Sequence, residues 1–280
     1  MLDVRPSPIA GLWYPGDPVA LAQAVDSQLS AAEARIPAGT ILGLVAPHAG
    51  HRYSGPVAAH AFRLVQGRRY DVVAVVSPMH HPYPGTVLTS THAAYGTPLG
   101  SVEIDREAVG RLADELSEHG IPMERVAQDP EHSLEIEIPF LQRALTPGFR
   151  LLPVMLRDQS PPVAKALGQS LADVLRDREV LLIASSDLSH FFPDPVARRL
   201  DGELLARLGA FDPEAVLAAE DEGVGFACGK GAVAAVLWAS AGLGANRVDI
   251  LKYAHSGEVT GDDLSVVGYG AAVIYRAQDT

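Results

Sequence analysis

The sequence predicts an α/β fold, with a single domain over residues 1–280 built on a central mixed sheet that helices flank. Short apolar segments of strand type alternate along the chain with longer segments of helical type. Several of the short segments contain almost no polar residue, which is typical of strands buried on both faces. The 280 residues, 48% of them hydrophobic, supply enough apolar mass for one sizeable core.

The expected strands share apolar, β-branched composition between turn residues. In chain order they are "TILGLVA" (40–46), "YDVVAVVS" (70–77), "FRLLPVML" (149–156), "EVLLIAS" (179–185), "NRVDILKYA" (246–254) and "LSVVGYGAAVIYR" (264–276). The expected helices show amphipathic spacing, prolines near their starts or glycines at their ends. They are residues 54–66, 105–120, 131–145 (with a proline inside), 161–176, 195–208, 213–219 and 229–244.

Charge and cysteine content narrow the class of protein. The net charge is −12, and the pI is about 5.2, which argues against a nucleic-acid or anionic-membrane binder. The short basic runs "GRR" (67–69) and "ARR" (197–199) are interpreted as solvated faces. A single cysteine excludes an intrachain disulfide. The first residues lack an apolar signal core and no long apolar run occurs, so we expect a cytoplasmic protein without a membrane partner.

Chemically capable side chains follow the ends of three predicted strands. They are His48 and His51, His80 and His81, and Asp187 and His190. In open α/β sheets the functional residues lie on loops at the carboxyl ends of the strands, so these side chains are expected on one rim. A single histidine after a buried strand is more often a hydrogen-bonded structural residue. Three strand ends that share the feature favour a metal site for His48 and His80.

Cys228 lies between glycines in "GVGFACGKG", directly before a predicted helix. A free cysteine is usually a small buried hydrophobic residue, and that interpretation stays open. The helix N-terminus and Lys230 are expected to lower the pKa of the thiol and favour the thiolate. A thiolate there would serve as a soft metal ligand or as a reactive group.

Two further segments gather chemically capable residues. "SSDLSH" places Asp187 and His190 three residues apart, a spacing that suits a general base or an oriented histidine. Its serines do not form a G-x-S-x-G elbow, so a serine hydrolase is disfavoured. "DPEHSLEIEIP" gathers Glu131, His132 and Glu135, which on spacing alone favours a solvated or capping cluster and is not a zincin motif. "GFACGK" and "GYGAAV" do not support nucleotide binding.

Eight motifs in order over nearly the whole chain resemble one family. They are "AGLWYPGD", "APHAGHRYSG", "SPMHHP", "YGTPLGSVEID", "EHSLEIEIPFL", "SSDLSH", "CGKG" and "YAHSGEVTGDDLSVVGYGAAVIY". Together they are similar to the Memo family, whose prokaryotic members belong to the AmmeMemoRadiSam system. The resemblance implies the fold of class III extradiol ring-cleavage dioxygenases. Those non-haem iron(II) enzymes bind iron through two histidines and a carboxylate.

The resemblance also implies roles for individual residues. The expected metal ligands are His48, His80 and Cys228, with the cysteine where the dioxygenases have their carboxylate. The expected catalytic residues are His190, at the position of the acid/base histidine, and Asp187. The expected substrate or outer-shell residues are His51, His81, His132 and Tyr53. Two imidazoles and a thiolate suit iron(II), the expected cofactor, and also copper or zinc.

This chain departs from the family pattern at two positions. His51 stands where the family usually has tyrosine, and Met79 stands where the family has a small polar residue before the histidine pair. The ligand positions are unaffected by either change. The substrate cannot be carried over from the family because His51 adds a titratable group beside the site.

Three hypotheses for function remain. The first is a metal-dependent oxidoreductase, using iron or copper, that acts on an unidentified small molecule or peptide. The second is a metal- or peptide-binding scaffold without catalysis. The third is a zinc-dependent hydrolase. The AmmeMemoRadiSam resemblance implies AMMECR-type and radical-SAM proteins as partners.

Overall fold

The computed structural model describes residues 3–33 and 35–278. In these residues nine strands form one large mixed sheet, and three form a small second sheet. The large sheet contains β2 (Gly39–Ala46), β3 (Val72–Pro78), β4 (Val87–Ser90), β7 (Met123–Val126), β8 (Arg150–Leu156), β9 (Val180–Ser185), β10 (His190–Phe192), β11 (Arg247–His255) and β12 (Val266–Ala277). The small sheet contains β1 (Val4–Arg5), β5 (Ala94–Thr97) and β6 (Gly100–Glu103).

The centre of the large sheet is parallel and its flanks are antiparallel. The strand order is β10-β12-β2-β9-β3-β8-β4-β7, and β11 pairs with β12 along the edge opposite β2. β2, β9, β3 and β8 run parallel to one another, while β12 is antiparallel to β2 and β4 is antiparallel to β8. Every residue of β3 and β9 is buried, which explains why these segments are apolar throughout.

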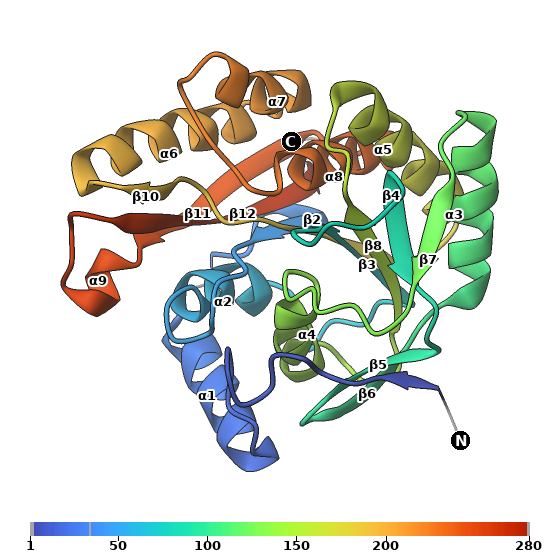
Figure 1. The fold of residues 1–280 in the computed structure, drawn as a ribbon, viewed down its shortest axis with the longest axis horizontal. Helices are drawn as coiled ribbons and strands as arrows, with labels where there is room; N and C mark the ends of the chain where they lie inside the picture. Colours follow the sequence, from blue (N-terminus) through green and yellow to red (C-terminus); the bar gives the residue numbers. More distant parts are fainter. Residues whose placement is uncertain (1–2, 34, 279–280) are drawn as a thin grey trace.

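Helices cover both faces of this sheet (Figure 1). One layer holds α1 (Pro18–Ala31), α2 (Gly55–Arg63) and α4 (Ile138–Ala144). The other holds α3 (Arg106–Glu118), α5 (Pro161–Leu175), α6 (Asp194–Gly209), α7 (Pro213–Asp221) and α8 (Lys230–Gly242). The short helices η1 (Glu135–Glu137) and α9 (Gly257–Thr260) lie in connecting segments. No helix in residues 3–33 and 35–278 is long and apolar enough to cross a membrane.

The predicted fold class, a single-domain α/β protein with a central mixed sheet flanked by helices, is confirmed. The helix predicted over residues 131–145 is shorter than expected, because only η1 and α4 form there. Pro139 lacks an N–H and is tolerated only in the first turn, so the helix begins at Ile138 rather than running through the proline.

Helix α1 was not predicted, although its signals are present in the sequence. Leu21, Val25 and Leu29 recur at helical spacing and are buried. Asp17 caps the first turn by accepting a hydrogen bond from the backbone N–H of Ala20. The other missed elements include strands of two to four residues, whose pairing with distant segments leaves little local signal.

Candidate metal centre

The carboxyl ends of three adjacent parallel strands place the predicted functional loops on one rim. β2 ends two residues before His48, β3 ends two residues before His80, and β9 ends two residues before Asp187. Because β9 pairs with both β2 and β3, these loops leave the sheet side by side. The arrangement that the sequence predicted for this edge is the arrangement that the topology produces.

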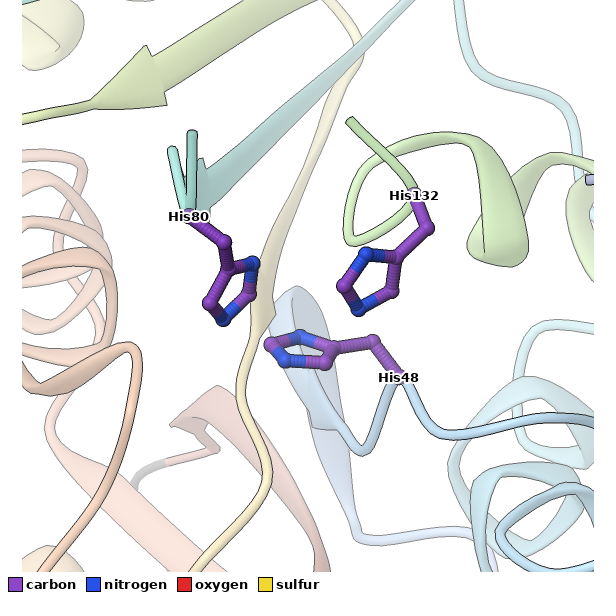
Figure 2. A group of neighbouring side chains, drawn as sticks. All are labelled: His48, His80 and His132. Carbon is purple, nitrogen blue, oxygen red and sulfur yellow. The ribbon is translucent and has the colours of Figure 1, made fainter. Parts of the chain in front are cut away.

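Three histidines converge at this rim (Figure 2). His48 follows β2, His80 follows β3, and His132 lies in the segment between β7 and η1. One ring nitrogen of each lies within 4.8 Å of the others, a spacing that could hold a metal ion. The ring centroids are 5.3 Å apart for His48–His80 and 4.9 Å apart for His80–His132. Figure 2 shows the three rings pointing toward a common centre.

His48 is buried, and a serine fixes its orientation. The His48 Nδ1 lies 3.0 Å from Ser185 Oγ, and that hydroxyl donates to the backbone oxygen of Ser133 at 2.6 Å. Since the serine proton has the oxygens of Ser133 and Glu137 as acceptors, Nδ1–H of His48 donates to Oγ, and unprotonated Nε2 faces the Cys228 thiol. Burial, with the neighbouring His132 and His80, lowers the pKa of His48 well below its ordinary value. A neutral imidazole with a free Nε2 is the form that binds metals.

Glu131 organises the other two histidines. Its carboxylate accepts hydrogen bonds from the His80 backbone N–H at 2.6 Å and from His80 Nδ1 at 2.9 Å. It also accepts from the backbone N–H groups of His132 and Ser133. Burial alone would raise the pKa of Glu131, but these hydrogen bonds outweigh it and hold that pKa below its ordinary value. Burial lowers the pKa of His132 to about 4, so this ring is also neutral at neutral pH.

The segment that carries Glu131 is anchored by Arg5, which lies in the N-terminal strand β1. Arg5 is buried, and its guanidinium donates to the Asp129 carboxylate at 2.7 and 2.9 Å and to the Glu131 backbone oxygen at 2.8 Å. It also contacts the Glu135 carboxylate at 2.5 Å. Arg5 therefore fixes the backbone on both sides of Glu131 and His132.

Cys228 reaches the same centre from the loop between α7 and α8. Its Sγ lies 3.1 Å from His48 Nε2 and 3.6 Å from the backbone oxygen of Asp187. The expectation of a lowered thiol pKa is wrong: burial, with the nearby Asp187 carboxyl, raises the pKa of Cys228. Lys230 does not offset this, because its Nζ pairs with Glu220 at 2.5 Å. The thiol would become a ligand by losing its proton as a metal binds.

Gly229 allows the cysteine loop to approach the sheet. A Cβ at this position would lie 2.5 Å from the backbone oxygen of Ser185, closer than any side chain can sit. The N–H of Gly229 donates to Ser186 Oγ, and Gln159 donates to the backbone oxygen of Cys228 at 2.7 Å. These contacts hold Cys228 beside His48 although 180 residues separate the two in sequence.

Asp187 lies in the loop after β9 and His190 begins β10, but the two do not form the pair that "SSDLSH" suggested. The Asp187 carboxylate accepts from the backbone N–H groups of His48 at 2.8 Å and Ala49 at 3.3 Å. Nδ1 of His190 instead donates to the backbone oxygen of Leu188 at 2.8 Å. Burial raises the pKa of Asp187 to about 7 and lowers the pKa of His190. Asp187 therefore positions the His48 loop.

The remaining predicted residues surround the centre at different depths. His51 is buried, its Nε2 donates to the backbone oxygen of Ile136 at 3.0 Å, and its ring packs against Phe140. It thus belongs to the packing beneath the loops. His81 is partly exposed beside the centre, and Tyr53 is 36% exposed. Trp13, from the N-terminal segment, also reaches this centre: its ring lies over His132 with ring centroids 4.1 Å apart.

His132 was expected outside the metal centre, and the structure brings it together with His48 and His80. It follows no predicted strand, so the strand-end rule did not select it. The available signal was its adjacency to Glu131, a carboxylate and a histidine in one turn. The sequence does not show that this turn faces the metal centre, because that depends on the hydrogen bond between Glu131 and His80.

The fold and this rim define a single-domain α/β protein with a candidate transition-metal site at the carboxyl edge of its central sheet. A profile of the family described as "Memo-like protein" matches residues 5–273. A MEMO1 family protein of Nitrosopumilus maritimus is 34% identical over 275 residues, 96% of this chain and 98% of that relative. Another, of Methanothermobacter thermautotrophicus, is 37% identical over 276 residues, 95% of this chain and 98% of that relative. The chain belongs to the Memo family.

Among solved structures, the crystal structure of an uncharacterized protein from Escherichia coli K12 is similar to this chain. The match covers 82% of this chain and 99% of the E. coli chain, with a TM-score of 0.54 and 20% sequence identity. At this identity the likeness shows a common fold.

Proposed function

We propose that this chain is a metal-dependent oxidoreductase that holds iron(II) or copper at the rim centre. The observation that carries the proposal is the convergence of three imidazoles, two of them with lowered pKa values, beside a partly buried thiol. Nitrogen and sulfur donors in this combination suit iron(II), copper and zinc. The resemblance of Memo proteins to extradiol dioxygenases supports the redox assignment.

His48 and His80 would be the constant ligands, with Cys228 or His132 as the third. Each constant ligand has its Nδ1 engaged by the protein, His48 by Ser185 and His80 by Glu131, which directs both Nε2 atoms to the centre. This is the arrangement of outer contacts that orients histidine ligands and tunes their basicity. When bound, iron(II) or copper would supply one-electron redox chemistry and an open position for dioxygen or substrate.

His190 would act as the acid/base residue. Its Nδ1–H is committed to Leu188, which leaves Nε2 as a proton acceptor. Its lowered pKa, caused by burial, keeps the ring neutral at neutral pH and able to take a proton from a substrate group. The ring packs edge-on against Phe226 with centroids 5.6 Å apart, so its orientation is restrained. Asp187 would contribute by holding the His48 backbone.

A zinc-dependent hydrolase is the second candidate, favoured by one observation. Three histidines are a donor set that catalytic zinc uses with an open fourth position. In that case the site would activate water and need no oxygen. A cytoplasmic location remains a prediction from the sequence, and partnership with AMMECR-type and radical-SAM proteins remains a prediction from the resemblance.

Elemental analysis of the untagged full chain, purified without chelator, tests the proposal. The informative variants are His48→Ala, His132→Ala and Cys228→Ser, and the matched control is His119→Ala, because His119 is exposed at the end of α3. Near-stoichiometric iron or copper, lost in His48→Ala and kept in the control, is expected. Of His132→Ala and Cys228→Ser, the variant that also loses its metal identifies the third ligand.

The same preparations then enter oxygen-consumption assays with catechols and thiols. Zinc alone, with hydrolysis that is independent of oxygen, would replace the proposal by the hydrolase. No metal in any preparation, even after anaerobic reconstitution, would refute both and leave a peptide- or ligand-binding scaffold.

A further inference from the structure

A cavity lies at the opposite edge of the sheet from the histidine rim. It has a volume of about 430 Å³ and lies at the amino ends of β2, β3 and β9. Its lining includes Thr40 to Leu42, Arg68 to Tyr70 and Arg178 to Val180, which precede or begin those strands. Cavities of this size are typical of small-molecule sites. Because the three strands are parallel, their amino ends are far from the metal centre at their carboxyl ends.

The cavity gathers arginines from three separate segments of the chain. Five guanidinium groups and one carboxylate, that of Glu179, line it. The arginines are Arg68, Arg69, Arg176, Arg178 and Arg276. The "GRR" run was interpreted as a solvated face, because the sequence does not show that β12 and the end of α5 bring three more arginines beside it. This concentration of positive charge occurs in a chain whose net charge is −12.

Ion pairing within the protein satisfies only part of this cluster. Arg178 pairs with Asp105 at 3.0 Å, and Arg176 pairs with Asp173 at 2.7 Å. Over residues 3–33 and 35–278, no carboxylate lies within 4.0 Å of Arg68, Arg69 or Arg276. Like charges held in one cavity repel each other, so an anion that enters would relieve this repulsion.

The donors fit a phosphate group better than a single carboxylate. Guanidinium groups bind phosphate through paired N–H donors, and three unpaired guanidiniums match the charge of about −2 that a phosphate monoester carries at pH 7. The rest of the lining offers both polar and apolar contacts: a Thr40 hydroxyl, a Tyr70 ring whose pKa burial raises to about 12, and the side chains of Leu42 and Leu243. An organic group attached to the phosphate would contact these side chains.

We propose that this cavity binds a phosphate-bearing small molecule, with Arg68, Arg69 and Arg276 on the phosphate. The site is separate from the metal centre and does not depend on the proposed redox function. The phosphate could be free or attached to an organic group, and both sources share the same recognition by arginine.

Isothermal titration of the untagged full chain distinguishes these sources. The probes are inorganic phosphate, ribose 5-phosphate and adenosine diphosphate, with adenosine as the phosphate-free control. The test variant is Arg69→Gln/Arg276→Gln. The matched control is Arg111→Gln, an exposed arginine of α3. His48→Ala is added because a phosphate could also bind a metal at the histidine rim.

We expect a Kd at or below about 1 mM for at least one phosphate probe, weakened at least about tenfold in the double variant. The affinity should fall with rising salt and stay unchanged in Arg111→Gln and His48→Ala. Tighter binding of an organic phosphate than of inorganic phosphate identifies a phosphorylated metabolite, and equal binding identifies the free ion. The proposal is overturned by no binding, by equal binding in the folded double variant, or by binding that only His48→Ala abolishes.

Discussion

Replacing Arg5 with methionine should destabilise both the fold and the metal centre. Arg5 is 1% exposed and contacts two carboxylates, Asp129 and Glu135, whose side chains are fully buried. Methionine fills much of the same volume but leaves two buried negative groups without their partner. Breaking a buried ion pair from one side costs about 3–5 kcal/mol, since the remaining charge keeps its desolvation penalty.

That loss is large against a total unfolding free energy of roughly 5–15 kcal/mol. For a chain of this length it corresponds to a fall in Tm of about 6–10 °C. The segment that carries Glu131 and His132 also loses its backbone anchor, so metal affinity should weaken by about 10–100-fold, as when outer contacts of a metal site are removed.

Urea unfolding of metal-free protein measures the first effect, and competition with a chelator measures the second. Arg143→Met is the matched control, because its pair with Asp26 is about 40% exposed and contributes at most about 1 kcal/mol. A loss below about 1 kcal/mol for Arg5→Met, equal to that of the control, would refute the argument that this ion cluster stabilises the rim.

Three further predictions follow from single contacts. Glu131→Gln should leave the fold intact but weaken metal affinity about 10–100-fold in the chelator assay, because His80 loses the carboxylate that fixes its ring. His51 has a folded pKa of about 4, below its unfolded value, so its contribution to stability is complete above pH 6.5 and is lost as the pH falls from 6.5 to 4. Urea unfolding measures the fall in unfolding free energy between pH 6.5 and pH 4. This fall should be smaller in His51→Gln than in the native chain, by up to about 3 kcal/mol. Gly229→Ala should cost about 1–3 kcal/mol and raise the reactivity of the cysteine thiol toward a disulfide reagent, since the new methyl group meets the Ser185 carbonyl.

Two of these predictions have a matched control variant, and His51→Gln is compared with the native chain. Glu131→Gln is compared with Glu118→Gln at the exposed end of α3, and unchanged metal affinity would contradict the role of Glu131. Equal acid sensitivity of His51→Gln and the native chain would show that His51 does not stay neutral when buried. For the glycine, Gly110→Ala has open space around its Cβ, so equal behaviour of the two variants would contradict the close approach at Gly229.

Local sequence was sufficient for the elements whose signals are local. Apolar strands with turn residues at their ends and amphipathic segments with caps predicted most of the central sheet and its covering helices. The strand-end rule also identified His48 and His80, because the topology of parallel strands places their following loops on one edge. These features repeat at fixed short periods and need no knowledge of distant contacts.

Tertiary structure decided the features that depend on residues far apart in the chain. The inclusion of His132 depends on Glu131 bonding to His80, 51 residues away. The raised pKa of Cys228 depends on burial beside Asp187, 41 residues away. Lys230 does not lower this pKa because it forms an ion pair with Glu220. The arginine cavity likewise joins arginines from three segments, none of which indicates a binding site alone. By itself the sequence determined which groups could take part in chemistry, because residue type and strand ends are local. Which of them meet, and in which protonation state, was decided by packing, because desolvation and charge act through space.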